Sequence, residues 1–366
     1  MDTTDLNISF NSVGICNHCQ SFDEIHKPRL DNENEEDLLN IISKIKNDKK
    51  NKKYDSILGL SGGVDSSFLA IKVFEYGLRP LVVHVDAGWN SAQAVMNIKR
   101  ILDYTGFELE TLVLKWPEIR DLQLSYLKSG VSNLDTVQDH AFFAGLYKFA
   151  IKNKIKYVLS GGNITSESVF PSKWHHPAMD LINLKAIHNK FGVKSIKTYP
   201  TVNFFEYFIK FPYINRMEVI RPLNYLNYNK IKAEKYLNDT IGYVSYGRKH
   251  GESIFTKFFQ NYILPKKHNI DKRIAHYSSL ILSNQMDRND ALKKLKEPLY
   301  DNLELINDKD YIANKLNINS DYLDQIIDSK PVNHEVYKNW NFYYKILQFL
   351  KPFVSIISKK LIKKYF

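Results

Sequence analysis

The feature that most constrains the fold is a glycine-containing turn at residues 61–67, which reads Ser-Gly-Gly-Val-Asp-Ser-Ser. An apolar run at 54–60 precedes it and is typical of a short buried strand, while apolar residues at helical spacing follow at 68–74. The turn therefore joins a strand to a helix, and its glycines let the backbone bend sharply and approach a ligand closely. Helix starts attract anions, most often phosphate, and we expect Ser66 to cap this helix.

The turn is not the GxxxxGK[ST] phosphate-binding loop, because no lysine follows its glycines. It resembles instead the loop of the PP-loop ATP pyrophosphatases, which cut ATP between its α- and β-phosphates. This resemblance implies that the turn holds the pyrophosphate part of ATP and that its aspartate is catalytic and helps to hold Mg²⁺. The residues assigned to ATP in this way are Ser61, Gly62, Gly63, Asp65 and Ser66. The alternative is a glycine turn in an ordinary α/β domain.

Strand-like and helical patterns alternate through the middle of the chain. Further strands are predicted at 80–86, 109–114 and 157–160, with a helix at 91–105 and a long helical region at about 118–152. Such alternation predicts a parallel sheet with helices on both faces. We therefore expect an α/β fold with a parallel-sheet PP-loop domain, Rossmann-like and of the adenine nucleotide α-hydrolase kind.

The chain of 366 residues is long enough for about two domains. We expect an N-terminal CxxC segment and linker helix at 1–53, a PP-loop domain at 54–228 and a mainly helical region at 229–366. The net charge of +11 suits a phosphate-bearing substrate, a nucleic acid or an anionic membrane surface. Apolar residues alternate with lysines in the tail, 340–366, which is expected to lie on an anionic membrane surface or a partner, or to pack on its own domain.

Neither a signal peptide nor a run of about 18 apolar residues is found in the sequence, so no membrane-spanning segment is expected. The two cysteines lie too close together to form a disulfide framework. We expect a cytoplasmic protein with peripheral membrane contact through the tail. Cys16 and Cys19 supply half of a tetrahedral zinc site, with His18 and His26 as further candidate ligands, or they are a pair of free thiols.

Polar residues collect where the predicted strands end, which is where ligands bind to parallel sheets. Asp86 follows the second strand, and Asp139 and His140 begin a helix that leads into the fourth. The residues that follow the fourth strand are Gly161, Gly162, Asn163 and Glu167. We expect all of them to face the turn. Taken singly, Asp86 fits a helix cap, Asn163 a turn and His140 a half-buried histidine with satisfied ring nitrogens.

Three later stretches add candidates. Trp174 and His175 form either a platform for a sugar or base, or a buried loop anchor. The dense aromatic residues at 201–228 are expected to be core. Arg221 is expected to reach a phosphate at the rim of the site, and Lys249 belongs to a glycine-flanked basic cluster that predicts a second phosphate site.

With these motifs in view, the chain resembles the N-acetyl sugar amidotransferases, a PP-loop branch acting in surface-polysaccharide biosynthesis. The resemblance spans about residues 2–335. The stretches that carry it are the turn, 135–141, 160–163 with Glu167, 184–192, 221–225 and 249–253. The turn alone identifies only the superfamily, and the combination points to this branch.

The resemblance implies that ATP and Mg²⁺ are used to convert the acetamido group of a nucleotide-activated sugar into an acetamidino group, with release of AMP and pyrophosphate. It names Asp139, His140 and Glu167 as candidate bases for ammonia. It also implies a separate glutaminase subunit, because neither cysteine sits in a nucleophile arrangement. Family members often carry another CxxC ahead of the stretch that matches residues 1–5, so the zinc ligand set here is incomplete.

Two other functions remain open from the sequence. Related PP-loop enzymes adenylate a base of tRNA, and the positive charge permits this, although thiolation usually needs cysteines near the nucleotide and none follows Cys19. A nucleic-acid substrate is therefore not favoured. A non-catalytic nucleotide-binding subunit is disfavoured by the intact aspartate and serines of the turn.

Overall fold

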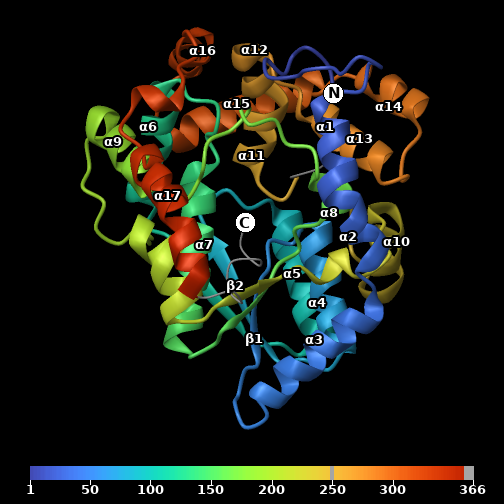
Figure 1. Ribbon diagram of the computed structural model, residues 1–366. Helices are drawn as coiled ribbons and strands as arrows, with labels where there is room; N and C mark the ends of the chain where they lie inside the picture. Colours follow the sequence, from blue (N-terminus) through green and yellow to red (C-terminus); the bar gives the residue numbers. More distant parts are fainter. Residues whose placement is uncertain (248–250, 358–366) are drawn as a thin grey trace.

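The computed structural model describes residues 1–247 and 251–357. A parallel sheet lies at the centre of the molecule (Figure 1), and its strands run in the order β3-β2-β1-β4-β5. The strands are β1 Ser56–Gly59, β2 Pro80–Asp86, β3 Leu109–Val113, β4 Tyr157–Leu159 and β5 Glu218–Ile220. The expected α/β parallel sheet is confirmed, with one strand, β5, that the sequence pattern did not reveal.

The strand order makes β1 the centre of the sheet. The chain moves from β1 to β2 and β3 on one side, and β4 and β5 lie on the other. The direction of winding therefore changes between β1 and β4, and ligands bind to open parallel sheets at such a point. The PP-turn, by which we mean residues 61–67, follows β1 directly.

Both faces of the sheet are covered by helices, which explains why its strands read as continuous apolar runs. Leu58 and Val82 face one buried cluster, whereas Ile57 and Val83 face another. The first cluster includes side chains of α3 Glu35–Asp48, α4 Val64–Glu75, α5 Ala92–Thr105 and α10 Lys230–Ile241, and the second includes those of α7 Thr136–Lys152.

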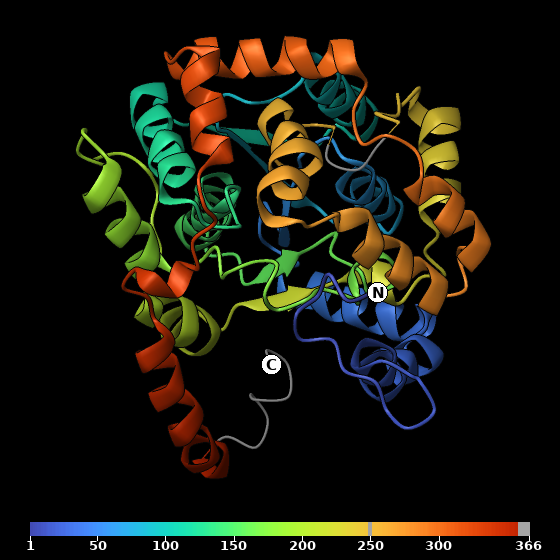
Figure 2. The ribbon, with the colours of Figure 1, turned by 90° about the horizontal axis from the view of Figure 1, so that it is seen from above.

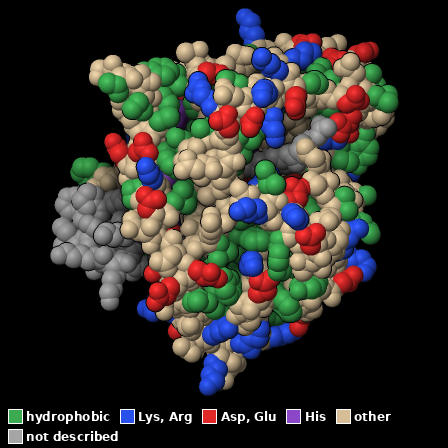
Figure 3. All heavy atoms as spheres, turned by 90° about the vertical axis from the view of Figure 1, so that its right-hand side faces the viewer, with side chains coloured by type: hydrophobic (Ala, Val, Ile, Leu, Met, Phe, Trp, Pro, Cys, Tyr) green, Lys and Arg blue, Asp and Glu red, His purple; other side chains and the backbone are tan. Residues whose placement is uncertain are grey.

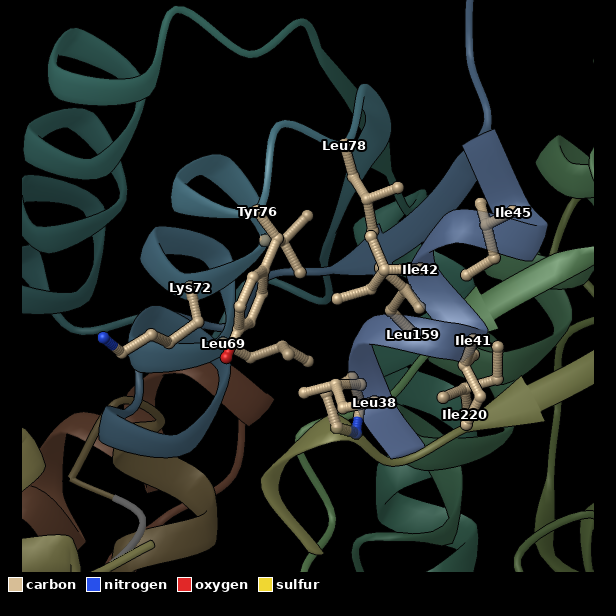
Figure 4. Close-up of a pocket in the computed structure, with 12 residues that line it drawn as sticks. Leu38, Ile41, Ile42, Ile45, Leu69, Lys72, Tyr76, Leu78, Leu159 and Ile220 are labelled. Carbon is tan, nitrogen blue, oxygen red and sulfur yellow. The ribbon is translucent and has the colours of Figure 1, made fainter. Parts of the chain in front are cut away.

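Helix α3 shows how the N-terminal part joins this core. Asn34 and Asp37 form a capping box that starts the helix. Its buried face carries Leu38, Ile42 and Ile45, which point toward α4 and the sheet around an apolar cavity of only about 10 Å³ (Figure 4). Truncating such a side chain, as in Leu38→Ala, should cost about 2–5 kcal/mol of stability.

The long helical region expected at about 118–152 is observed. It is two helices, α6 Trp116–Ser129 and α7, separated at Gly130. This glycine has φ +74°, which ends α6, and a Cβ there would lie 3.0 Å from the side chain of Val332 and 3.2 Å from the carbonyl oxygen of Lys330. The glycine is thus required both by its backbone conformation and by the close crossing of a distant segment.

The remaining elements are short helices at the N-terminus, loop helices near β4 and β5, and the C-terminal helical region. They are α1 Asn17–Ser21, η1 Phe22–His26, α2 Lys27–Asn32, α8 Ile164–Glu167, α9 Leu181–Phe191, η2 Glu206–Ile214, η3 Pro222–Asn224, α11 Ile254–Phe258, η4 Phe259–Ile263, α12 Leu264–His268, α13 Lys272–Leu282, α14 Arg288–Leu295, α15 Asn302–Leu316, α16 Ser320–Asp328, η5 His334–Val336 and α17 Asn341–Ile357. Within the described ranges, no helix is long and apolar enough to cross a membrane. The three-part division of the chain stays a prediction.

One side of the surface is visible in Figure 3, where basic and acidic side chains are interspersed. That face therefore offers no broad patch of a single charge for a nucleic acid backbone.

Candidate active site

The PP-turn is fixed in place at its second residue. Gly62 has φ +83°, and a Cβ there would lie 2.8 Å from the carbonyl oxygen of Ala94 in α5, so only glycine fits. The hydroxyl groups of Tyr243 and Tyr246 donate to the carbonyl oxygen of Gly62 at 3.1 and 3.0 Å. The turn is thereby held between α5 and two tyrosines from the C-terminal region.

The start of α4 is left open to a ligand. Its N-cap is Gly63, and among the described residues no side chain caps it. The expected capping role of Ser66 is wrong: Ser66 lies in the first turn, and its hydroxyl donates to the carbonyl oxygen of Gly63 at 3.1 Å. The Ser61 hydroxyl lies 3.1 Å from that of Ser66 and accepts from the Gly63 N–H at 3.2 Å. The N–H groups of the first helical turn therefore remain for an anion.

Asp65 stands in this first turn with one carboxylate oxygen engaged. Its Oδ1 accepts from the hydroxyl of Tyr228 and, at 3.5 Å, from the amide of Asn163. Burial raises the pKa of Tyr228 well above its usual range, and the charges of Asp65 and Glu167 raise it further, so the phenol stays a donor. Because both described donors use Oδ1, Oδ2 is left for a cation.

The loop after β4 packs directly on the PP-turn, as the strand-end argument predicted. A Cβ on Gly161 would lie 3.2 Å from the backbone of Asp65, so this glycine allows the two loops to touch. A Cβ on Gly162 would lie 3.7 Å from Oε2 of Glu167 and 3.8 Å from Nε of Arg221. A carboxylate and a guanidinium group thus converge beside the turn. Asn163 also caps α8, accepting from the Ser166 N–H at 3.0 Å.

A cavity of about 1020 Å³ opens from this junction. The PP-turn, the loop after β4, Glu167 and Arg221 line one part of it, and aromatic side chains line another. Of the aromatic residues expected to be core, Phe211 is buried, but Tyr207 and Phe208 also face the cavity. Since ligand pockets are usually about 300–1,000 Å³, this volume leaves room for two ligands side by side.

A segment from the C-terminal region forms another wall. Ser253 pairs with Asn90 in an isolated antiparallel bridge, and the carbonyl oxygen of Glu252 accepts from the Ser91 N–H at 2.8 Å. The Glu252 carboxylate comes within 3.3 Å of where a Cβ would stand on Gly63. Glu252 and Ser253 are thus beside the turn, whereas Lys249 of the basic cluster predicted as a second phosphate site lies outside the described residues.

Asp86 supports the site from outside the cavity. Its Oδ1 accepts from the Gly88 N–H at 2.7 Å and from the Asn90 amide at 3.1 Å. It closes a turn and does not cap a helix. The Asn90 amide also lies 2.9 Å from Nε2 of His84, so this network fixes the loop that pairs with Ser253.

His140 is enclosed by backbone. Nδ1 bonds to the carbonyl oxygen of Ala178 at 2.9 Å, and Nε2 accepts from the Val202 N–H at 3.1 Å. Burial lowers its pKa to about 4, so the ring is neutral and both nitrogens are occupied. The reading of a satisfied histidine fits this geometry, and we leave His140 out of the proposed reaction.

Asp139 differs from its neighbour. It is exposed to solvent, yet protein surrounds it closely enough that burial, followed by the charge of Asp135, raises its pKa to about 7, while Lys272 acts in the opposite direction. Asp135 is fixed by the Thr256 hydroxyl at 2.9 Å and the Gln260 amide at 3.1 Å. Asp139 is thus a carboxylate with a raised pKa that does not line the cavity of the PP-turn.

Trp174 and His175 do not reach the cavity of the PP-turn. Trp174 is 4% exposed and packs within the C-terminal core cluster, which fits a buried loop anchor and leaves its ring no open face for a sugar or base. His175 packs edge-on against Phe170 with ring centroids 4.2 Å apart, and burial lowers its pKa to about 4.

At the N-terminus, the Sγ atoms of Cys16 and Cys19 lie 3.5 Å apart, and both thiols are free. Nε2 of His18 pairs with the carboxylate of Asp5 at 2.6 Å. Across the described part of the chain, no three His, Cys, Asp or Glu side chains are grouped to hold a metal ion.

Sequence reasoning missed the tyrosines that contact the turn and its aspartate. Tyr228, Tyr243 and Tyr246 are ordinary aromatic residues in the sequence, and nothing in their spacing separates them from core residues. Glu252 belongs to the glycine-flanked basic cluster of the sequence, but the phosphate site predicted there rested on the basic residues of that cluster and not on this carboxylate.

Comparisons with known proteins bear on the C-terminal part. Residues 252–351 match the family model described as "LPS biosynthesis protein WbpG-like, C-terminal domain". NMN synthetase from Francisella tularensis is similar in structure, with 15% identity, 77% of this chain and 93% of that chain covered, and a TM-score of 0.35. For the NH3-dependent NAD synthetase from Campylobacter jejuni the values are 14%, 71%, 95% and 0.35. With TM-scores this low, neither structure carries weight for fold or function.

No match was found among curated proteins. The family match covers the segment that supplies Glu252 and Ser253 to the site. Residues 252–351 are thus similar to the C-terminal domain of WbpG-like lipopolysaccharide biosynthesis proteins, which agrees with the resemblance drawn from the sequence motifs.

Proposed function

We propose that the chain is an ATP-dependent amidotransferase that converts the acetamido group of a nucleotide-activated N-acetyl sugar into an acetamidino group during surface-polysaccharide, O-antigen-type, biosynthesis. The observation that carries this proposal is the PP-turn, an uncapped helix start beside a carboxylate that opens into a cavity of about 1020 Å³. The match of residues 252–351 to a lipopolysaccharide biosynthesis domain supports the choice of substrate.

The first step activates a poor electrophile. The carbonyl oxygen of the amide attacks the α-phosphorus of ATP, the bond to the β-phosphate breaks, and pyrophosphate leaves. The amide nitrogen gives up its proton, so an O-adenylyl imidate forms. Negative charge builds on the departing pyrophosphate, where the N–H groups of the first turn of α4 and the guanidinium of Arg221 can stabilise it.

The second step replaces oxygen by nitrogen. Ammonia adds to the imidate carbon, the carbon–oxygen bond breaks, and AMP leaves as the amidine forms. Ammonium must first lose a proton. Glu167 lines the cavity and is our candidate for the base, whereas Asp139, the other carboxylate expected from the sequence, does not line it. The ammonia is proposed to come from a separate glutaminase subunit.

The donors around the turn fit Mg²⁺. This ion is usually held by one or two carboxylates together with substrate phosphates, so a closed set of protein ligands is not needed. Asp65 offers Oδ2, and Glu167 lies close enough that its charge also acts on Tyr228. When bound, the ion would neutralise charge on the pyrophosphate.

The test is a product analysis with purified protein, ATP, Mg²⁺, ammonium and a panel of nucleotide-activated N-acetyl sugars. We expect AMP and pyrophosphate, and a sugar in which mass spectrometry finds one oxygen replaced by NH. Asp65→Asn should abolish turnover, whereas Asp103→Asn, at an exposed position paired with Lys99, should not. ADP and phosphate as products would refute the proposal. ATP cleavage stimulated by tRNA and indifferent to sugar would favour tRNA modification instead.

A further inference from the structure

Helix α17 extends away from the rest of the molecule (Figure 2) and carries an exposed apolar side. Phe342 is 69% exposed, Ile346 43% and Phe349 73%. These positions are spaced i, i+4 and i+7, so they share one face of the helix. An apolar face this exposed is not part of the core, and a fully solvated helix would carry polar side chains at these positions.

Other side chains of the same segment attach it to the body. The ring of Tyr343 lies 5.9 Å from that of Phe204, and the ring of Tyr344 lies 5.7 Å from that of Phe208. Just before the helix, Trp340 is 5% exposed, and its backbone N–H donates to the buried carboxylate of Asp180 at 2.8 Å. The helix is therefore held in a defined position while its apolar face stays outside.

The positive charge of the surrounding stretch indicates which kind of surface this apolar face binds. Residues 336–366 contain seven lysines and no acidic residue, so this short stretch supplies seven of the eleven net positive charges of the chain. Lys338 and Lys345 are exposed beside the apolar side chains. Apolar residues combined with lysines alone are typical of helices that lie in the interface of an anionic membrane.

We propose that α17, with the exposed lysines Lys338 and Lys345 beside its apolar side, binds the surface of anionic lipid membranes. The apolar face enters the interface, and the lysines contact the lipid phosphates. A second copy of the chain is disfavoured as the occupant, because two such segments would bring seven lysines against seven.

The position of α17 gives this docking a consequence for the cavity. Phe208 packs against Tyr344 of α17 and also lines the cavity of the PP-turn. Binding to lipid therefore holds one wall of the cavity close to the membrane surface.

The test uses the full chain and vesicle flotation without ATP. Vesicles of phosphatidylcholine with phosphatidylglycerol are compared with phosphatidylcholine alone, at low and high salt. We expect binding to the anionic vesicles that weakens with salt. The double variant Phe342→Ser and Ile346→Ser should bind at least about tenfold more weakly, because it removes two apolar side chains from the surface that enters the membrane interface.

The matched control is the double variant Val193→Ser and Leu303→Ser, at positions 86% and 68% exposed elsewhere on the surface, and it should bind as the parent does. Thermal unfolding of both variants checks that they are folded. The proposal is overturned if anionic vesicles are not bound, if neutral vesicles are bound equally, if the α17 variant binds undiminished, or if that variant instead abolishes a dimer in solution. Because flotation needs no turnover, its outcome is separate from that of the proposed reaction.

Discussion

The substitution Gly62→Ala tests whether the PP-turn depends on its contact with α5. Gly62 has φ +83°, and the new methyl group would stand 2.8 Å from the Ala94 carbonyl oxygen. That oxygen belongs to the backbone of a helix whose N-cap, Ser91, is hydrogen-bonded to the Ala94 N–H. Neither partner can move like a flexible side chain, so the turn itself must shift.

The expected cost has two parts. Placing alanine in the left-handed region costs roughly 1–2 kcal/mol. Forcing a methyl group into a closed contact costs about 1–3 kcal/mol more. Gly106 provides the control, because its φ is +66° but a Cβ there would meet nothing within 4 Å. Gly106→Ala should therefore cost only the first part, and the difference between the two variants measures the contact.

The assay is urea unfolding of both variants and the parent, paired with measurement of ATP cleavage. We expect Gly62→Ala to lose about 2–5 kcal/mol, and ATP cleavage to fall about a hundredfold because a misplacement of the order of 1 Å suffices for that. Gly106→Ala should keep its activity. If the two variants lost equal stability and both cleaved ATP normally, the account of the turn would be refuted.

Three further predictions follow from the same structure. Tyr228→Phe removes a hydrogen bond to the Asp65 carboxylate worth about 1.5–3 kcal/mol, so the Mg²⁺ concentration for half-maximal ATP cleavage should change about tenfold or more; an unchanged titration would remove Tyr228 from the site. Burial and a neighbouring charge raise the folded pKa of Asp139 from 3.8 to about 7, so the folded state binds more protons between those values and loses stability as pH rises. The unfolding midpoint of Asp139→Asn relative to the parent should therefore rise from pH 5 to pH 8, and a constant difference would contradict the shift. The isolated chain should use ammonium but not glutamine as nitrogen donor, because its two cysteines form a close pair without a nucleophile arrangement; equal rates with both donors would remove the need for a glutaminase partner.

Local patterns in the sequence were sufficient for most of the sheet. The strand at 80–86 was predicted with its observed bounds, because a short run of apolar and β-branched residues strongly favours a buried strand. β5 was missed because three residues are too short to show a period. The exact position of the break at Gly130 depends on a distant segment, since a Cβ on this glycine would lie 3.0 Å from the side chain of Val332.

In the candidate site, too, some roles follow from the local sequence and others depend on contacts between distant parts of the chain. The role of Gly62 in the PP-turn could be assigned from the sequence, because only glycine meets the backbone demand at φ +83°. The roles of Trp174 and His140 depended on burial, and burial comes from helices that lie far along the chain. The contact of Tyr228 with Asp65 joins residues 163 positions apart, so no local sequence pattern predicts it.

The bridge between Asn90 and Ser253 also has a consequence for how the protein is made on the ribosome. The PP-turn and β1 emerge early, but the wall that contains Glu252 is synthesised roughly 190 residues later, which takes about 10–40 s at ~5–20 residues per second. Tyr243 and Tyr246, which hold the Gly62 carbonyl, emerge only shortly before it. A nascent chain therefore exposes the PP-turn and the uncapped start of α4 for many seconds before the contacts that fix the turn can form.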